Sequence, residues 1–315
     1  MRIIFLGTAD FAVPALKALA GEKDFEIVSV LTRPDRRAGR GQKVCFNPVK
    51  QAALELDLPV YQPEDIREPD AVSFMESLQP DILAVVAYGQ ILNRKVLGIP
   101  RLAAVNLHGS LLPAYRGAAP VHRAVMDGQT RAGVCTMHMA PKLDAGDVIF
   151  CEETPVPPEM TAGELYDNLA GLGGPLLVRT LQEIGAGKAP RTPQREEEAT
   201  YAPMLTHEDR QVDWNLPAKV IRNRIRGLYP WPGAYTFFRG ERMALASATV
   251  LEEDSGLPPG TVVSADCHTG LVVACGEKTL LVERIRPAGK KEMMCQAWLN
   301  GASIEPGDRF DVKEE

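Results

Sequence analysis

An asparagine and a histidine lie two positions apart, directly after an apolar run, and could act together on one carbonyl group. Asn106 and His108 follow the run Leu102–Val105. If residues 103–108 form a strand, the two side chains point to the same face, because side chains alternate along a strand. An amide donor and an imidazole on one face can both address a carbonyl oxygen that becomes negative in a tetrahedral transition state. The pair therefore predicts acyl-transfer chemistry.

A carboxylate further along the chain completes a candidate catalytic triple. Asp144 lies in the segment Leu143–Asp147, ahead of another apolar run. A carboxylate close to His108 would favour the imidazolium and fix its orientation. The triple holds no serine or cysteine nucleophile, so the attacking group would belong to the substrate. Two alternatives stay open: these polar atoms cap strand ends, or Asp147 is the acid that acts.

Positioning these side chains requires strands that end at a common edge. Short apolar runs alternate with helix-like segments over residues 1–155, which favours crossover units and a mostly parallel, doubly wound Rossmann-like sheet of the α/β class. The strand candidates are Ile3–Leu6, Ile27–Leu31, Ile82–Val86, Ala103–Leu107, Gly133–Met137 and Asp147–Phe150. Such a sheet binds ligands at the carboxyl ends of its strands, where Asn106 and His108 would lie.

The second half of the chain predicts a smaller domain of another kind. Residues 160–186 predict a helix, and the polar, proline-containing residues 190–206 predict a linker between domains at 1–189 and 207–315. The second domain opens with an amphipathic helix, Pro217–Leu228. Short strand-like runs follow, divided by Gly, Pro and Asp, which is typical of a small, OB-like β-barrel.

Composition excludes several classes of protein. The 315 residues are 45% hydrophobic and 24% charged, as in globular proteins, and no apolar run could span a membrane. Because no signal peptide or membrane segment is recognisable, we expect a cytoplasmic protein without a membrane partner. Gly7 lacks the further glycines of a dinucleotide fingerprint, so a nicotinamide or flavin cofactor is disfavoured. Histidine and cysteine spacings predict no metal site, and the six cysteines predict reduced thiols.

Two basic segments stand out in a chain whose net charge is −6. Residues 33–50 hold six basic residues and one acidic residue, a local charge of +5, and the candidates for phosphate contacts there are Arg36, Arg37, Arg40 and Lys43. Lys219, Arg222 and Arg226 are spaced to share one face of the helix 217–228. The alternative to phosphate binding is a solvated surface loop for residues 33–50 and an ordinary amphipathic helix for residues 217–228. The acidic balance predicts no DNA partner, and the lack of an apolar stripe favours a monomer.

Taken together, these motifs carry a resemblance that covers nearly the whole chain. The segments Asn106–Pro113, Tyr115–Pro120 and Leu143–Asp147 resemble the folate-dependent formyltransferases. So do the opening segment Phe5–Ala12, the loop Pro34–Lys43, Pro230–Pro232 and Arg286–Lys291. The central motif alone marks the superfamily, and the loop and the second domain make the resemblance more specific.

The resemblance implies a reaction and roles for named residues. The formyl group of 10-formyltetrahydrofolate would pass to the free α-amine of initiator methionyl-tRNA, by direct attack through a tetrahedral intermediate, in translation initiation. Asn106 would bind the oxyanion, imidazolium His108 would stabilise it and protonate the leaving N10, and Asp144 would hold His108 charged and help remove amine protons. The folate contacts would be Ser110, Leu111, Leu112 and Pro113, with Tyr88, Gly89 and Gln90 as the pterin-pocket wall. Both basic segments would bind tRNA, with Arg40 first among them.

Two other functions compete with this interpretation. A relative with the same fold could formylate a smaller amine, such as a nucleotide sugar or glycinamide ribonucleotide, and the catalytic triple does not separate the two substrates. The basic loop and the second domain favour tRNA. A non-catalytic RNA-binding protein is the third possibility, and the intact triple Asn106, His108 and Asp144 argues against it.

Overall fold

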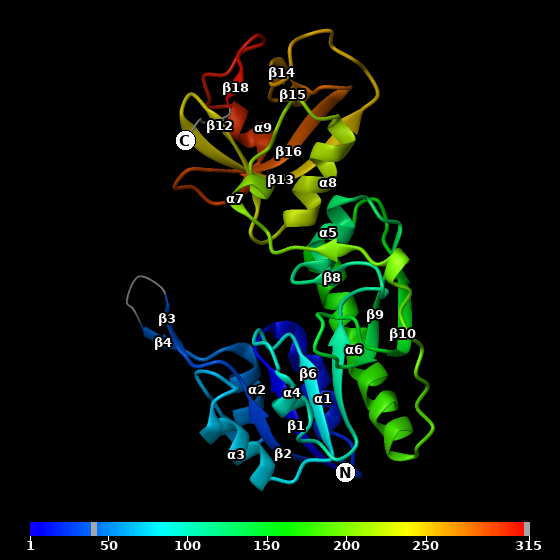
Figure 1. Cartoon of the computed structure of the whole chain (residues 1–315). Coiled ribbons are helices and arrows are strands. Elements are labelled where there is room, and N and C mark those ends of the chain that lie inside the picture. Colours follow the sequence, from blue (N-terminus) through cyan, green and yellow to red (C-terminus); the bar gives the residue numbers. More distant parts are fainter. Residues whose placement is uncertain (39–42, 312–315) are drawn as a thin grey trace. The chain divides into compact units, whose positions relative to one another are not determined.

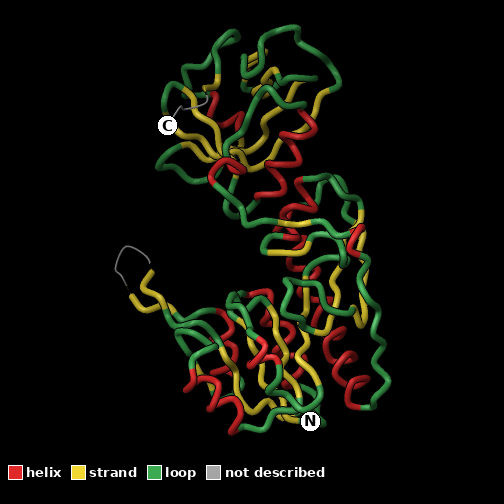
Figure 2. Tube along the Cα trace, in the orientation of Figure 1, coloured by secondary structure: helices red, strands yellow, loops and turns green. Residues whose placement is uncertain are grey.

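The computed structural model describes residues 1–38 and 43–311, which form two compact units (Figures 1 and 2). The first unit consists of Met1–Pro120, Arg131–Thr154 and Tyr166–Ala202. The second consists of Val121–Thr130, Pro155–Leu165 and the chain from Pro203 onward. Each unit has its own sheet, and the predicted catalytic triple lies entirely within the first.

The sheet of the first unit is mostly parallel, as the sequence predicts. Its order is β10-β9-β7-β6-β1-β2-β5. The bounds are β1 (Arg2–Gly7), β2 (Glu26–Leu31), β5 (Val60–Tyr61), β6 (Ile82–Val86), β7 (Ala103–His108), β9 (Arg131–His138) and β10 (Val148–Pro155). Pairing is parallel from β7 through β6, β1 and β2 to β5, whereas β7 and β9 are antiparallel. Every residue of β6 is buried, which is why its sequence is a continuous apolar run.

The order of the strands places a topological switch between β1 and β6. From β1 the chain continues to β2 on one side and later to β6 and β7 on the other. The helices of this unit are α1 (Val13–Ala20), α2 (Pro48–Glu55), α3 (Pro69–Ser77), α4 (Arg94–Leu97) and most of α6 (Ala162–Gly185). Doubly wound sheets bind ligands at such a switch, outside the carboxyl ends of the strands. Gly7, Val86 and His108 end three of those strands.

A short parallel pair joins two distant loops of the first unit. β8 (Arg116–Gly117) pairs with β11 (Tyr201–Ala202), just after the 3-10 helix Glu196–Glu198. The compact units therefore divide the chain differently from the predicted linker at 190–206, because residues 190–202 pack into the first unit. Segments 121–130 and 155–165 pack with the second unit. Residues 190–202 are polar and contain prolines, as a linker does. Their composition therefore does not reveal that they pack against the first unit.

The second unit is an OB-like antiparallel sheet that curls on itself. Its order is β14-β15-β16-β13-β12-β18, with β17 beside β16. The strands are β12 (Ala234–Phe238), β13 (Glu241–Leu251), β14 (Val262–Asp266), β15 (Gly270–Ala274), β16 (Thr279–Pro287), β17 (Met293–Met294) and β18 (Phe310–Asp311). A bridge between Thr261 and Arg309, with a bond from the Val262 amide to Asp308 O, brings the two ends of the sheet together. The curl is visible in Figure 2.

Helices and a buried aromatic cluster complete this second unit. They are α5 (Pro120–Met126), α7 (His207–Arg210), α8 (Ala218–Leu228) and α9 (Cys295–Leu299). Ile221, Ile225 and Leu228 of α8 are buried with Trp214 and the inward side chains of the barrel. The amphipathic pattern of 217–228 thus forms the predicted helix, which packs against β13.

The prediction of reduced thiols is wrong for two of the six cysteines. Cys135 on β9 and Cys151 on β10 form a disulfide, while Cys45, Cys267, Cys275 and Cys295 are free. The two Cα atoms lie 4.1 Å apart because β9 and β10 are neighbouring strands. A separation of 16 residues without a CxxC motif gives no hint of this pairing, since it depends on the register of the hairpin.

Replacing Cys151 with serine is expected to destabilise the protein by about 3 kcal/mol, the loop-closure value for a crosslink of this length. The measurement is urea unfolding without reductant, with Cys45→Ser, at an exposed free thiol, as the control. With dithiothreitol the variant and the parent should unfold alike. A difference that persists in reductant would assign the effect to packing rather than to the crosslink.

Candidate active site

The carboxyl end of β7 presents an amide and an imidazole on one face. Asn106 and His108 alternate with buried Leu107, and they pair across to Met137 and Cys135 on β9. The His108 side chain is nearly buried, with 7% of the residue exposed. Asn106 is half-buried, and its amide has no hydrogen-bond partner among the described residues. A polar group in this position is available to a bound substrate.

Asp144 lies beside the histidine, as the sequence predicts. Its Oδ2 atom is 3.8 Å from His108 Nδ1 and accepts a 2.8 Å hydrogen bond from the Gly117 amide. His108 Nε2 lies 3.0 Å from the Tyr115 carbonyl oxygen. Each ring nitrogen therefore faces an oxygen atom of the protein that can accept from it. The competing acid, Asp147, pairs with Arg191 at 3.2 Å instead.

The turn that carries Asp144 is held by residues that sequence reasoning missed. Gln194 donates from Nε2 to the carbonyl oxygens of Asp144 and Gly146, at 2.8 and 2.7 Å. Arg116, with a fully buried side chain, donates to Gln194 Oε1 through Nε and Nη2. Arg116 lies inside the family motif, but Gln194 falls in the predicted linker, where nothing in its neighbourhood signals a role.

The predicted folate loop follows β7 directly. Ser110 is buried, and its hydroxyl donates to Ala114 O at 2.6 Å, so it is occupied within the loop. Leu112 is buried against Cys135 and Met137, whereas Leu111 and Pro113 are half-buried. The loop is thus packed onto β9, beside the face that bears Asn106 and His108. A ligand there would meet the half-buried side chains and the loop backbone rather than the Ser110 hydroxyl.

The predicted pterin-pocket wall offers backbone rather than side chains. Tyr88 points into the core, and burial raises the pKa of its hydroxyl. Gln90 is bonded to the loop at 63–66 through both ends of its amide. Ala87 and Gly89 are exposed, with φ of 45° and 83°. A flat pterin rich in donors and acceptors can be read by such backbone groups, so these residues fit a folate that binds through the main chain.

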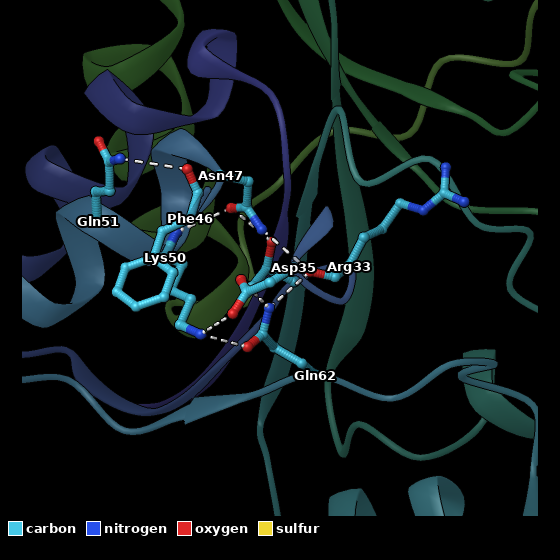
Figure 3. Close-up of polar contacts among 8 residues, drawn as sticks. Arg33, Asp35, Phe46, Asn47, Lys50, Gln51 and Gln62 are labelled. Atoms are coloured by element: carbon cyan, nitrogen blue, oxygen red, sulfur yellow. Dashed lines mark hydrogen bonds and ion pairs between the residues drawn. The ribbon is translucent and has the colours of Figure 1, made fainter. Parts of the chain in front are cut away.

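The first basic segment forms a hairpin with a polar clamp at its base. β3 (Arg36–Ala38) and β4 (Lys43–Cys45) pair antiparallel and project from the first unit (Figure 1). The predicted contacts Arg36, Arg37 and Lys43 lie on these strands, and Arg40 lies outside the described residues. Figure 3 shows Lys50, Asp35 and Gln62 pointing toward one another, whereas the Arg33 side chain extends away from them.

The clamp ties both ends of the hairpin to the sheet. Lys50 Nζ donates to Asp35 at 2.5 Å and to Gln62 at 2.8 Å, and this ammonium holds the pKa of the Asp35 carboxyl below its usual value. Gln62 and Asn47 both donate to the Arg33 carbonyl oxygen. Because Lys50 and Asp35 neutralise each other, the charge of +5 in this segment comes from its other basic residues.

The second basic segment does not form the predicted surface patch. Arg226 is buried, donates to Asn223 Oδ1 and Met160 O, and has its pKa lowered by burial. Arg222 is mostly buried and pairs with Glu159 at 2.6 Å. Lys219 alone of the three is exposed. The segment 155–165 belongs to the second unit, as α8 does. It covers the face of α8 that the helical spacing predicts to be exposed.

Comparison with known proteins identifies the family. Residues 1–181 match the formyl transferase model, and residues 204–303 match the formyl transferase C-terminal domain. The chain is 49% identical to the methionyl-tRNA formyltransferase of Moorella thermoacetica, over 98% of both chains. It belongs to the methionyl-tRNA formyltransferase family. Another methionyl-tRNA formyltransferase, from Symbiobacterium thermophilum, is 44% identical over 100% of this chain and 96% of its own.

Solved structures of other formyltransferases share the fold of this methionyl-tRNA formyltransferase family member. A sugar 3N-formyl transferase, crystallised with dTDP and 5-N-formyl-THF, superposes with a TM-score of 0.66 at 16% identity, covering 92% of this chain and 99% of the other. HypX from Aquifex aeolicus in complex with tetrahydrofolic acid gives 0.61 at 18%, covering 100% and 51%. Within the described residues, no helix is both long and apolar enough to cross a membrane, and no cluster of side chains could hold a metal.

Proposed function

We propose that this enzyme transfers the formyl group of 10-formyltetrahydrofolate to the α-amine of initiator methionyl-tRNA at Asn106, His108 and Asp144. The observation that carries this assignment is the pair on β7: a half-buried amide without a partner among the described residues, beside an imidazole flanked by two acceptors. That pair can stabilise an oxyanion without a covalent enzyme intermediate. The reaction is direct transfer between two substrates.

The proposed mechanism follows the movement of two protons. The free amine attacks the formyl carbon, and the carbonyl oxygen becomes negative while it accepts a hydrogen bond from the Asn106 amide. His108, as imidazolium, stabilises this charge and gives a proton to N10 as the C–N bond breaks. Asp144 keeps the imidazolium in place, and it helps to remove a proton from the attacking amine through water. The products are the N-formyl amine and tetrahydrofolate.

Folate binding is proposed at two loops that follow β7 and β6. Ser110, Leu111, Leu112 and Pro113 would lie along one side of the substrate, and the backbone at Tyr88, Gly89 and Gln90 would face the pterin. Exposed main chain with positive φ at Ala87 and Gly89 supports the second contact. Recognition there would depend on main-chain groups, so substitutions that alter only a side chain should have modest effects.

The tRNA is proposed to bind through the hairpin, with Arg36, Arg37, Arg40 and Lys43 on the phosphates. Lys219 can add a contact in the second unit. Arg226 is left out because it is buried, and Arg222 is engaged by Glu159. We assign catalysis to the N-terminal domain and tRNA binding to both domains, and we propose a cytoplasmic monomer.

Lys50→Met is expected to raise the KM for methionyl-tRNA about tenfold, equivalent to about 1.4 kcal/mol, with kcat retained. The variant removes the ion pair and the bond to Gln62 that hold the base of the hairpin. Steady-state kinetics with each substrate varied in turn provide the measurement. Lys17→Met, at an exposed pair with Glu55, is the matched control. An unchanged KM for methionyl-tRNA in Lys50→Met would show that the clamp does not contribute to tRNA binding.

The proposed acceptor is tested by transfer of radiolabelled formyl from 10-formyltetrahydrofolate. Initiator methionyl-tRNA, elongator methionyl-tRNA and a nucleotide-sugar amine are compared as acceptors. Formylation of the initiator alone is the expected result. Formylation of both tRNAs would keep the reaction and remove initiator selectivity. Formylation of the small amine alone would overturn the tRNA assignment and leave the hairpin without its proposed role.

A further inference from the structure

The turn that presents Asp144 depends on contacts from outside itself. Asp144 has a φ of 48°, in the left-handed region that few non-glycine residues adopt. It lies between β9 and β10, and the Asp144 and Gly146 carbonyl oxygens both accept from Gln194 Nε2. Gly146 has no room for a side chain, because a Cβ there would lie 1.7 Å from the His138 carbonyl oxygen. The position of the carboxylate is therefore set by how this turn is held.

The orientation of the Gln194 amide is fixed by its other partner. Arg116 can only donate, and its Nε and Nη2 atoms lie 3.0 and 2.9 Å from one end of the amide. That end must be the oxygen, so the NH₂ group must face the two carbonyl oxygens of the turn. The Arg116 side chain is fully buried, which keeps water from competing for these bonds. One amide thus connects a buried guanidinium to the Asp144 turn.

The two neighbours of Arg116 in the chain each contact one member of the proposed His108–Asp144 pair. The preceding residue, Tyr115, supplies the carbonyl oxygen near His108 Nε2, and the following residue, Gly117, donates its amide to Asp144 Oδ2. Arg116 and Gln194 therefore hold the two acceptors of His108 in one connected network. We propose that Gln194 is a positioning residue, which sets the Asp144 carboxylate against His108. This inference rests on the proposed function, in which these two residues act in catalysis.

Two variants of Gln194 test the proposal. One removes the contact with Arg116, and the other keeps it. Gln194→Met removes the two bonds from Arg116 and the two bonds to the carbonyl oxygens of the turn. Gln194→Glu keeps an acceptor for Arg116 and replaces the donors to the turn with an oxygen, and it creates an ion pair with Arg116 that favours folding. Both are expected to lower kcat about 10- to 100-fold, the cost of a small misplacement of a catalytic group, with KM unchanged for both substrates.

Glu196→Gln is the matched control. Glu196 also bonds Arg116, at 3.0 Å, but its carboxylate is exposed, and its other bond goes to the Lys142 side chain rather than to the backbone carbonyl oxygens of the Asp144 turn. Its kcat should stay near that of the parent. Circular dichroism and the thermal midpoint establish that each variant is folded. Parental kcat in folded Gln194→Met and Gln194→Glu would overturn the proposal, and so would an equal loss in Glu196→Gln.

A double-mutant cycle separates positioning from a general structural effect. If Gln194 acts through Asp144, Gln194→Met should change kcat little in an Asp144→Asn background, because the group it positions is already altered. The same fold-loss in both backgrounds would show a structural role and overturn the inference. Parental activity in Asp144→Asn alone would instead overturn the proposed function, and the inference would fall with it.

Discussion

Replacing His108 with alanine is expected to lower kcat at least about 100-fold, the lower limit for losing a positioned general acid. Two losses contribute to the result. The imidazolium no longer stabilises the oxyanion, and the leaving N10 must take its proton from water. Both effects belong to the transition state, so the KM values of both substrates should change little. Single-turnover formyl transfer at saturating folate and methionyl-tRNA measures the chemical step directly.

The structure provides a matched histidine for this experiment. His138 ends the neighbouring strand β9, opposite Val105, and burial lowers the pKa of its ring. His138→Ala removes an imidazole from the same sheet without touching the proposed centre, and its kcat should stay near that of the parent. A near-normal kcat in His108→Ala, with the fold intact, would end the catalytic assignment.

The second large effect is expected at Asn106. Asn106→Ala should lower kcat about 10²- to 10³-fold, the value for removing one oxyanion-hole donor. The free amide in the described structure makes this prediction specific, because the substitution breaks no bond of the protein. Stability should therefore change less than activity. Urea unfolding and single-turnover kinetics on the same preparations compare the two.

Asn106→Asp sharpens this test because it preserves shape. A carboxylate at this position would repel the developing oxyanion and would also lie on the same face as His108. We expect a loss at least as large as that of Asn106→Ala. If Asn106→Asp were as active as the parent, the amide would not be the oxyanion donor, and the acyl-transfer chemistry would have to rest on His108 alone.

Local patterns predicted the strands and much of the site. The run Ile82–Val86 coincides with β6 because it is an uninterrupted stretch of apolar residues. The alternation around His108 correctly indicated one shared face with Asn106. The residue pattern placed Asp144 in the triple and left Asp147 as the alternative acid, and the structure pairs Asp147 with Arg191 instead.

What sequence could not predict depends on contacts between distant segments. Arg226 has the spacing of an exposed helix face, yet the segment around Met160 covers it. Cys135 and Cys151 become partners only through the register of β9 and β10. Gln194 bonds a buried arginine 78 positions away. Helical or strand periodicity describes one element at a time and carries no information on such partners.

The pairing of β8 with β11 has a consequence for the order in which the protein becomes active during synthesis. Tyr115 donates its amide to Thr200 across 85 positions, and Arg116 bonds Gln194 and Glu196 across 78 and 80 positions. A nascent chain released at residue 189 would hold every strand of the parallel sheet, but Arg116 would lack Gln194 and Glu196 as partners. The loops around the proposed centre therefore have all these partners only once the ribosome has translated beyond Ala202, and we expect fragments cut at the predicted linker to be inactive.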